Sequence, residues 1–320
     1  MEIFMKVIEH LARATEPMIS FEVIPPKRGG DISSLLQVID DIVKYKPPYI
    51  EITSHAAEVV YDETNSGIKK RVIRKRPGTL GICALIQKKY NIDAVPHILC
   101  QGFTREETED FLIELQYLEI ENLLAIRGDE NSYKKPVDPG RSINGYALDL
   151  VKQMNDMNHG KYLDEALLDA NSTDFCIGVA GYPEKHFEAP NMKNDLKFLK
   201  QKIDAGADYI VTQLFYDNEK FKSFVGLCRN EGINVPIIPG IKPISTKNQV
   251  LTLPKFFHID LPDELVDAID KCKDDEAVKQ VGIEWAIKQS KDLIDFGVPC
   301  IHYYTMGKSL SVREVVKAVY

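Results

Sequence analysis

Short apolar segments alternate with helix-forming segments along the whole 320-residue chain, and this alternation restricts the fold more than any other feature. Each apolar segment is short and largely composed of strand-forming residues, which is typical of strands covered by helices. The eight predicted strands are Ile19–Ile24, Tyr49–Thr53, Val95–Leu99, Asn122–Ile126, Phe175–Val179, Tyr209–Thr212, Pro236–Pro239 and Cys300–Tyr304.

The segments between these strands carry the signals of crossover helices. Within Asp31–Tyr45, one helical face carries Leu35, Leu36, Ile39, Ile42 and Val43. Thr104 and Glu107 form a capping box, which predicts a helix start. Gly206 predicts the end of a helix over Asn194–Ala205. Residues 246–290 are mostly helical in pattern, and residues 311–320 predict a last helix.

Eight strands, each followed by a helix, predict a (β/α)8 barrel, also called a TIM barrel, in the α/β class. An open doubly wound sheet usually has fewer strands, and neither the G-x-G-x-x-G nor the G-x-x-x-x-G-K-[ST] signature supports it here. No linker or repeat divides the chain, so we expect one barrel domain over residues 1–320. The polar segment Met157–Thr173 is predicted to be an inserted loop.

Composition and charge narrow the class of protein. The net charge is −8 and the sequence pI is about 5.5, which disfavours a nucleic-acid binder. The basic cluster Lys69–Arg76 is interpreted as the solvated face of a helix. No apolar stretch approaches the roughly 20 residues needed to cross a bilayer, and no signal-peptide core opens the chain. Six scattered cysteines without a C-x-x-C pair predict reduced thiols, a cytoplasmic location and no metal site.

The segment ISFEVIPPK, residues 19–27, carries a carboxylate at the end of an otherwise apolar strand. Pro25 and Pro26 stop the strand shortly after Glu22. Glu22 could be a structural residue that pairs with a neighbouring lysine or arginine, or it could perform chemistry. In (β/α)8 barrels, active sites gather at the C-terminal ends of the strands, and Glu22 lies at such an end.

The other predicted strands also run into polar or aromatic residues. They are Thr53, Ser54, His55, His97, Arg127, Gly128, Asp129, Tyr182, Glu184, His186, Gln213, Phe215, Tyr216, Tyr303, Tyr304, Thr305 and Lys308. Each has a structural explanation when taken singly, but together they predict a ligand site on one rim. These residue types hydrogen-bond to and stack on a large flat polar ligand. Without a metal constellation or a nucleophile elbow, the pattern favours a bound organic cofactor.

Six segments, in this order and spacing, resemble the methylenetetrahydrofolate reductase family. They are SFEVIPPK (20–27), VPHILC (95–100), LLAIRGD (123–129), AGYPEKHFEA (180–189), DLKFLKQKIDAGADYIVTQLFYD (195–217) and VPIIPGIKPI (235–244). The resemblance implies a barrel that binds FAD and a homo-oligomer. It also implies ping-pong chemistry, in which NAD(P)H reduces the flavin and 5,10-methylenetetrahydrofolate then takes a hydride from flavin N5, giving 5-methyltetrahydrofolate.

The resemblance also assigns expected roles by position. Glu22 matches the catalytic glutamate, expected to protonate N10 of the substrate. Asp129 matches an aspartate near the flavin and the pterin. Gln213 matches a glutamine that contacts nicotinamide and pterin. Glu22, Gln213, Leu253 and Lys308 fall at substrate positions. The positions expected to bind FAD are Thr53, His97, Ile126, Arg127, Gly128, Asp129, Tyr146, Ala147, Tyr182, His186, Asp195 and Lys202.

Some residues depart from the family pattern. Thr53-Ser54-His55 stands where bacterial relatives often have Thr-Tyr-Gly. Leu253 stands where some bacterial members have a substrate-stacking phenylalanine, and Lys308 stands where some have an arginine for the folate tail. These departures concern the substrate tail and the choice of pyridine nucleotide. The chain length predicts a bacterial-type catalytic domain without the C-terminal regulatory domain of eukaryotic members. Two alternatives stay open: a flavin-free folate- or pterin-binding barrel of the methyltransferase type, and a flavin subunit of a larger redox complex.

Overall fold

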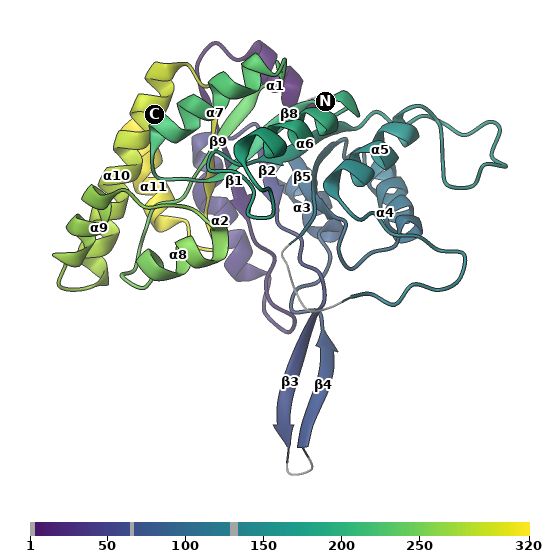
Figure 1. The fold of residues 1–320 in the computed structure, drawn as a ribbon, viewed down its shortest axis with the longest axis horizontal. Helices are drawn as coiled ribbons and strands as arrows, with labels where there is room; N and C mark the ends of the chain where they lie inside the picture. The colour runs from purple at the N-terminus through teal and green to yellow at the C-terminus, as the bar shows by residue number, and fades with distance from the viewer. Residues whose placement is uncertain (1–3, 65–66, 129–133) are drawn as a thin grey trace.

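Eight parallel strands close into a barrel in the order β1-β10-β9-β8-β7-β6-β5-β2 (Figure 1). The computed structural model describes residues 4–64, 67–128 and 134–320. The barrel strands are β1 (Met18–Val23), β2 (Tyr49–Ile52), β5 (Asp93–Leu99), β6 (Asn122–Ile126), β7 (Cys176–Gly181), β8 (Tyr209–Leu214), β9 (Ile237–Ile241) and β10 (Cys300–Tyr304). This confirms the predicted (β/α)8 class, and the predicted strand ends differ from the observed ones by at most two residues.

Helices surround the barrel. They are α1 (Val7–Arg13), α2 (Ser33–Ile42), the short 3-10 helix η1 (Val43–Tyr45), α3 (Leu80–Tyr90), α4 (Arg105–Tyr117), α5 (Ala147–Asn158), α6 (Met192–Asp204), α7 (Asn218–Asn230), α8 (Gln249–Phe257), α9 (Asp263–Asp270), α10 (Asp275–Phe296) and α11 (Leu310–Val319). The capping box at α4 is confirmed, because Glu107 N donates to Thr104 Oγ1 at 3.2 Å and Thr104 N donates to Glu107 Oε2 at 2.8 Å. Because α5 ends at Asn158, the predicted loop 157–173 began two residues too early.

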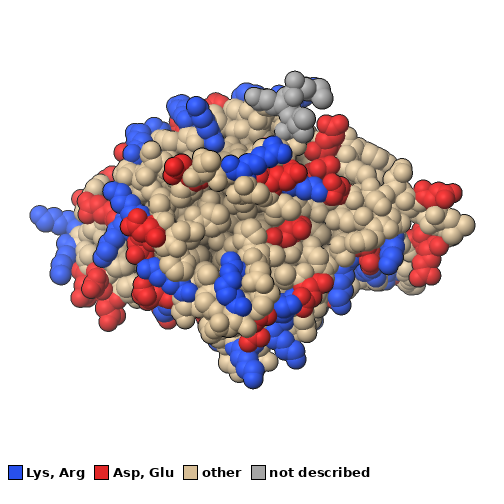
Figure 2. Space-filling view, turned by 90° about the horizontal axis from the view of Figure 1, so that it is seen from above, with Lys and Arg blue, Asp and Glu red and all other residues tan. Residues whose placement is uncertain are grey.

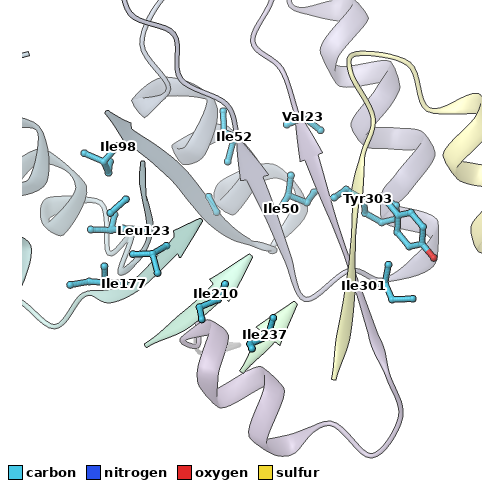
Figure 3. Close-up of a cluster of buried hydrophobic side chains, with 14 of the residues drawn as sticks. Val23, Ile50, Ile52, Ile98, Leu123, Ile177, Ile210, Ile237, Ile301 and Tyr303 are labelled. Atoms are coloured by element: carbon cyan, nitrogen blue, oxygen red, sulfur yellow. The ribbon is translucent and has the colours of Figure 1, made fainter. Parts of the chain in front are cut away.

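Side chains of each strand alternate between two cores. Outward-facing residues such as Ile50 and Ile52 of β2 pack against the helices (Figure 3). Inward-facing residues such as Tyr49, Val95 and Tyr209 fill the barrel near its N-terminal end. This period of two follows from the pleat of the strand, which turns successive side chains to opposite faces. It also places Glu51, between Ile50 and Ile52, inside the barrel.

Helix α1 lies across the N-terminal end of the barrel. Val7 is fully buried against the inward-facing core, and its N–H donates to Asn122 Oδ1 at 2.7 Å. His10 Nε2 lies 2.6 Å from Asp93 Oδ2, and Met5 N donates to both oxygens of Asp93. The helix therefore closes this end with apolar packing and with polar side chains at the starts of β5 and β6.

A two-stranded hairpin extends from the barrel between β2 and α3 (Figure 1). It comprises β3 (Glu58–Thr64) and β4 (Gly67–Ile73), which pair antiparallel. The predicted helix at Lys69–Arg76 is therefore wrong: its first five residues belong to β4. β-Branched residues on both strands, with Val59 opposite Val72, and Tyr61 on β3 favour the extended state and outweigh the run of cations.

Charged side chains of both signs lie on the surface of the molecule. On the face shown in Figure 2, lysine and arginine side chains are interspersed with aspartate and glutamate side chains. Within the described part of the chain, no helix is both long enough and apolar enough to span a bilayer.

Candidate active site

Glu22 lies at the C-terminal rim of the barrel, as predicted. In the parallel register it is level with Tyr304 of β10 and Glu51 of β2. Its side chain is nearly buried, and the residue is 7% exposed. Thr305 Oγ1 donates to the main-chain oxygen of Glu22 at 2.7 Å, which ties the end of β1 to the end of β10. The strand end therefore holds the carboxyl group inside the rim instead of releasing it to solvent.

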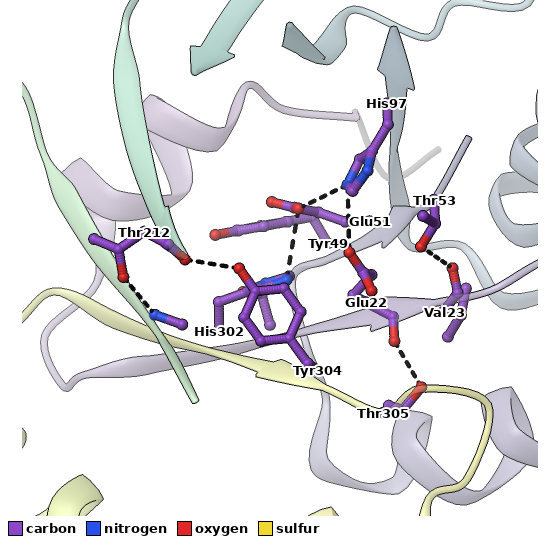
Figure 4. A network of polar contacts seen from close by, with 12 residues as sticks. Glu22, Val23, Tyr49, Glu51, Thr53, His97, Thr212, His302, Tyr304 and Thr305 are labelled. Atoms are coloured by element: carbon purple, nitrogen blue, oxygen red, sulfur yellow. Dashed lines mark hydrogen bonds and ion pairs between the residues drawn. The ribbon is translucent and has the colours of Figure 1, made fainter. Parts of the chain in front are cut away.

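Glu22 belongs to a network of carboxylates and histidines inside the barrel (Figure 4). His97 Nε2 lies 3.2 Å from Glu51 Oε2 and 3.9 Å from Glu22 Oε2. His302 Nε2 lies 3.6 Å from Glu51 Oε2, and His302 Nδ1 lies 2.9 Å from Ser20 Oγ. Four strands supply these side chains, so the network forms only when the barrel closes.

The network changes the protonation of its members. Burial alone would raise the pKa of Glu51, but His302 and His97 outweigh it and hold that pKa below its ordinary value. Burial alone would lower the pKa of His97, but the hydrogen bond to Glu51 and the charge of Glu22 raise it. Burial lowers the pKa of His302. Glu51 acts in the opposite direction and raises this pKa, while the charge of His97 lowers it further. The cluster therefore favours an ionised Glu51, a protonated His97 and a neutral His302.

Tyr304 forms one wall beside Glu22. Its hydroxyl donates to the main-chain oxygen of Thr212 at 2.7 Å, and its ring meets His302 edge-on at 5.0 Å. Gly240 makes room for this ring, because a Cβ there would lie 2.5 Å from Tyr304 Cε2. The glycine in IIPGI thus determines where an aromatic side chain stands at the rim.

The end of β6 supplies the cation Arg127 and, at Gly128, a stretch of backbone that no side chain covers. The guanidinium of Arg127 pairs with Glu188 and lies over the ring of Tyr146 at 5.3 Å. Tyr146 is the N-cap of α5, and Ala147 is the first residue of that helix. Ile126 and Gly128 flank Arg127, and Gly128 has a φ of +96°, which favours glycine. Asp129 lies outside the described residues.

The loop after β7 and helix α6 bring four predicted residues together, with Asp195 in the first turn of α6 and Lys202 in its last turn. The rings of Tyr182 and His186 meet edge-on at 4.7 Å. His186 N donates to Asp195 Oδ2 at 2.9 Å. Lys202 Nζ donates to the main-chain oxygen of Ala180 at 2.9 Å, and burial lowers the pKa of Lys202 to about 8. These groups lie beside the rim, where β7 passes into its loop.

The remaining predicted residues occupy different surroundings. Gln213 lies in β8 where the register with β9 is irregular, a feature that re-aims side chains. Thr53 follows β2, and its Oγ1 donates to Val23 O at 3.2 Å. Leu253 of α8 is 4% exposed within an apolar cluster that packs against Tyr304. Lys308 is exposed in the loop after β10.

A cavity of about 530 Å³ opens beside His97 at the ends of β2 and β5. Its lining includes Ser54, Arg74, Phe103 and the ion pair between Glu107 and Lys135. The cavity is thus lined by charged groups, by an aromatic ring and by His97, which belongs to the carboxylate–histidine network. It can accept a polar ligand with an extended flat part.

The sequence interpretation missed Glu51 and His302. The signal for Glu51 was present, because a carboxylate between two isoleucines in YIEIT is as unusual as Glu22 in its own strand. Among the described residues, no cluster of histidine, cysteine or acidic side chains could hold a metal ion. Burial raises the pKa of Cys100 and of Cys300 to about 12, so neither thiol is a ready nucleophile at neutral pH.

Comparison with known proteins identifies relatives over nearly the whole chain. The family model "Methylenetetrahydrofolate reductase" matches residues 7–320. The chain is 34% identical over 325 residues to "Methylenetetrahydrofolate reductase (NADH) 1" of Arabidopsis thaliana, covering 98% of this chain and 50% of the relative. It is 32% identical over 292 residues to "5,10-methylenetetrahydrofolate reductase" of Escherichia coli strain K12, covering 91% of this chain and 86% of the relative.

The eukaryotic relatives are longer than this chain, which spans about half the length of the first curated relatives it matches. Among solved structures, a Clostridium thermocellum protein described as binding two copies of 5-methyl-5,6,7,8-tetrahydrofolic acid has a TM-score of 0.58. It is 13% identical, and the match covers 98% of this chain and 97% of that chain. This likeness establishes a shared fold.

Proposed function

We propose, since the chain belongs to the methylenetetrahydrofolate reductase family, that it reduces 5,10-methylenetetrahydrofolate to 5-methyltetrahydrofolate with NADH or NADPH. The observation that carries the proposal is Glu22. It is a nearly buried carboxyl group at the barrel rim, 3.9 Å from a histidine and beside an aromatic wall. Such a group can hold a proton at a fixed point and deliver it to a bound substrate.

The described residues fit FAD as the bound cofactor. His97 Nδ1 and Gln101 Oε1 are buried polar atoms without a hydrogen-bond partner in the described structure, and polar edges of a flat ring system would satisfy them. Gly128 has no side chain and therefore leaves its backbone open next to Gln101. A Cβ added at Gly128 would lie 3.5 Å from the Cβ of Gln101. Arg127 offers charged donors suited to phosphate. Bound FAD would carry a hydride from the pyridine nucleotide to the folate.

Further side chains at the strand ends and on helices α5 and α6 are proposed to hold FAD. They are Thr53, Ile126, Tyr146, Ala147, Tyr182, His186, Asp195 and Lys202. Asp129, proposed as a catalytic residue near the ring system, has no described position. The proposed cofactor site therefore extends along the ends of β2, β5, β6 and β7, on one side of Glu22.

We assign the acid role to Glu22 for a chemical reason. The five-membered ring of the substrate must open before its methylene carbon can accept a hydride, and N10 is a poor leaving group until it is protonated. Glu22 in its protonated form would supply that proton. Gln213 is proposed to contact the nicotinamide and the pterin in turn, and Leu253 and Lys308 are proposed to lie near the folate, Lys308 towards its tail.

Two measurements on the purified protein test this proposal. The visible spectrum should show bound flavin, either directly or after reconstitution with FAD. Anaerobic mixing with NADH or NADPH should bleach the flavin, and 5,10-methylenetetrahydrofolate should then restore its colour. A protein that takes up no FAD would instead support the flavin-free folate-binding barrel. A flavin that only a partner protein can reduce would support a subunit of a redox complex.

A further inference from the structure

Glu51 is a buried carboxylate to which the family resemblance gave no role. It lies in the middle of β2, its side chain is 1% exposed, and its Oε1 has no hydrogen-bond partner within the described part of the chain. An ionised group in such a place is expensive unless it is paired, so its partners explain why it is there. Its partner at 3.2 Å is His97, which in turn lies 3.9 Å from Glu22.

We infer that Glu51 is a positioning residue for Glu22: through His97 it fixes a positive charge beside the acid. The inference rests on the proposed function of Glu22. In our assignment Glu51 itself contacts neither the cofactor nor the substrate, although its partner His97 belongs to the proposed cofactor site. Glu51 acts from behind the histidine, deeper in the barrel.

The position of the hydrogen on His97 follows from the geometry. Nε2 faces carboxylate oxygens of both Glu51 and Glu22, and carboxylates only accept. Nε2 must therefore carry a hydrogen. With two carboxylates on one side, the imidazolium form, protonated at both nitrogens, is favoured over the neutral ring. The free Nδ1–H would then be available to a ligand.

The other groups that face Glu51 do not replace His97 as the source of positive charge. His302 approaches from β10, and Tyr304, Tyr49 and Tyr209 surround the same space. Burial lowers the pKa of His302, and burial raises the pKa values of all three tyrosines, so these groups stay neutral near pH 7. Among the described residues facing Glu51, His97 is the cation.

This arrangement has a defined effect on the acid. A cation 3.9 Å from Glu22 favours the ionised form of Glu22. If Glu51 loses its charge, His97 becomes neutral at a lower pH and this influence disappears. Glu22 then keeps its proton to a higher pH. Glu51→Gln should therefore extend the folate half-reaction to higher pH without abolishing it.

The test compares wild type with Glu51→Gln, Glu51→Asp and Asp93→Asn, all as holoenzyme. Asp93→Asn is the matched control, because Asp93 is another buried carboxylate paired with a histidine, at the opposite end of the strand that carries His97. One readout is the pH dependence of flavin reoxidation by 5,10-methylenetetrahydrofolate. The second is the titration of His97 by NMR with isotope-labelled histidine, assigned with His97→Gln.

We expect the high-pH limit of reoxidation to rise by about one pH unit in Glu51→Gln, as for removal of a charge within roughly 4 Å. The titration of His97 should move to lower pH in the same variant. Glu51→Asp should restore both towards wild type, and Asp93→Asn should change neither. An unchanged His97 titration in Glu51→Gln, or an equal shift of both readouts in Asp93→Asn, would overturn the inference.

Wild type supplies an independent test should Glu51→Gln fail to fold. His97 must titrate above its ordinary value of about 6.5, and a lower value contradicts the inference. Failure of the proposed function looks different. In that case wild-type holoenzyme does not react with 5,10-methylenetetrahydrofolate at all, while the His97 titration still shows whether Glu51 sets its charge.

Discussion

Strand β5 carries a histidine–carboxylate pair at each end of the barrel, and the two pairs differ in how completely their hydrogen bonds are made. At the N-terminal end, Asp93 accepts from Met5 N with both oxygens and lies 2.6 Å from His10 Nε2. At the rim, His97 faces two carboxylates at 3.2 and 3.9 Å, and one oxygen of Glu51 has no partner in the described structure. The same kinds of side chain therefore have all their carboxylate oxygens hydrogen-bonded at the N-terminal end, but leave one carboxylate oxygen without a described partner at the rim.

The difference separates a structural role from a functional one. At the base, the side chain of Asp93 binds Met5 and His10 and so ties the N-terminal segment with α1 to the barrel, and changing the pair should change stability. At the rim, the spare hydrogen-bonding capacity lies next to Glu22 and the cavity beside His97. A partly satisfied polar group inside a protein carries an energetic penalty, and such groups are retained where a ligand completes them.

The largest expected effect is on the rate at the rim. Glu22→Gln should slow flavin reoxidation by 5,10-methylenetetrahydrofolate at least roughly 100-fold, because the amide cannot act as an acid. Reduction of the flavin by NAD(P)H needs no proton from Glu22 and should change less than about tenfold. Anaerobic stopped-flow measures both steps in one preparation. Reoxidation at the wild-type rate would show that Glu22 is not the acid.

The next effect is on stability at the base. His10→Leu leaves the buried carboxylate of Asp93 without its histidine and should reduce the free energy of unfolding by about 3 kcal/mol. The rates of both half-reactions should stay near wild type in the folded fraction. Urea unfolding measures the change, with His159→Leu as a control at an exposed histidine. If His10→Leu slowed flavin reoxidation as strongly as Glu22→Gln, the N-terminal end of the barrel would also contribute to the reaction, and the proposed division into a structural end and a functional end would be wrong.

A smaller effect is expected on the pH dependence of the free energy of unfolding, to which Glu51 and His97 both contribute. The lowered pKa of Glu51 stabilises the fold above its unfolded value of about 4.3, and this stabilisation is lost as the pH falls through the folded value. The raised pKa of His97 stabilises the fold below about 6.5, and this is lost as the pH rises through the folded value. The stability margin of wild type over Glu51→Gln should therefore be largest between about pH 4.5 and 6.5 and narrow above it. A margin that widens above that range would contradict the assigned charges.

The smallest effect is expected on the hairpin, where an ion pair is exposed. Arg71 binds Asp62 with both Nε and Nη2, but both side chains are open to solvent. Asp62→Asn should leave the unfolding midpoint unchanged within error, because water and salt screen such pairs. Thermal unfolding at low and high salt checks this. A clear loss of stability would mean that burial is not what distinguishes the two barrel pairs from this one.

A feature could be predicted from the sequence when it depends on residues close together in the chain, and could not when it depends on residues that are distant in the chain. The eight strands and the cap at Thr104 were predicted because period, segment length and capping are local properties of the chain. The hairpin was misread because a run of lysine and arginine fits a helix face as well as a strand. Its strands pair along their whole length, for example at Val59 and Val72, two residues that no short window of the sequence contains together.

The barrel and the position of Glu22 at its rim could be predicted from the residue pattern alone, since a charged residue at the end of an apolar strand is favoured where the strands open. The sequence also contained a signal for Glu51, a carboxylate between two isoleucines, which our prediction did not use. The partners of each carboxylate could not be predicted in this way, because they come from other strands and from α1. Closure of the barrel brings His97 and His302 from distant parts of the chain to Glu51, and α1 brings His10 to Asp93. The physical reason is that hydrogen bonds and charges act over a few ångströms in space, whatever the separation along the chain.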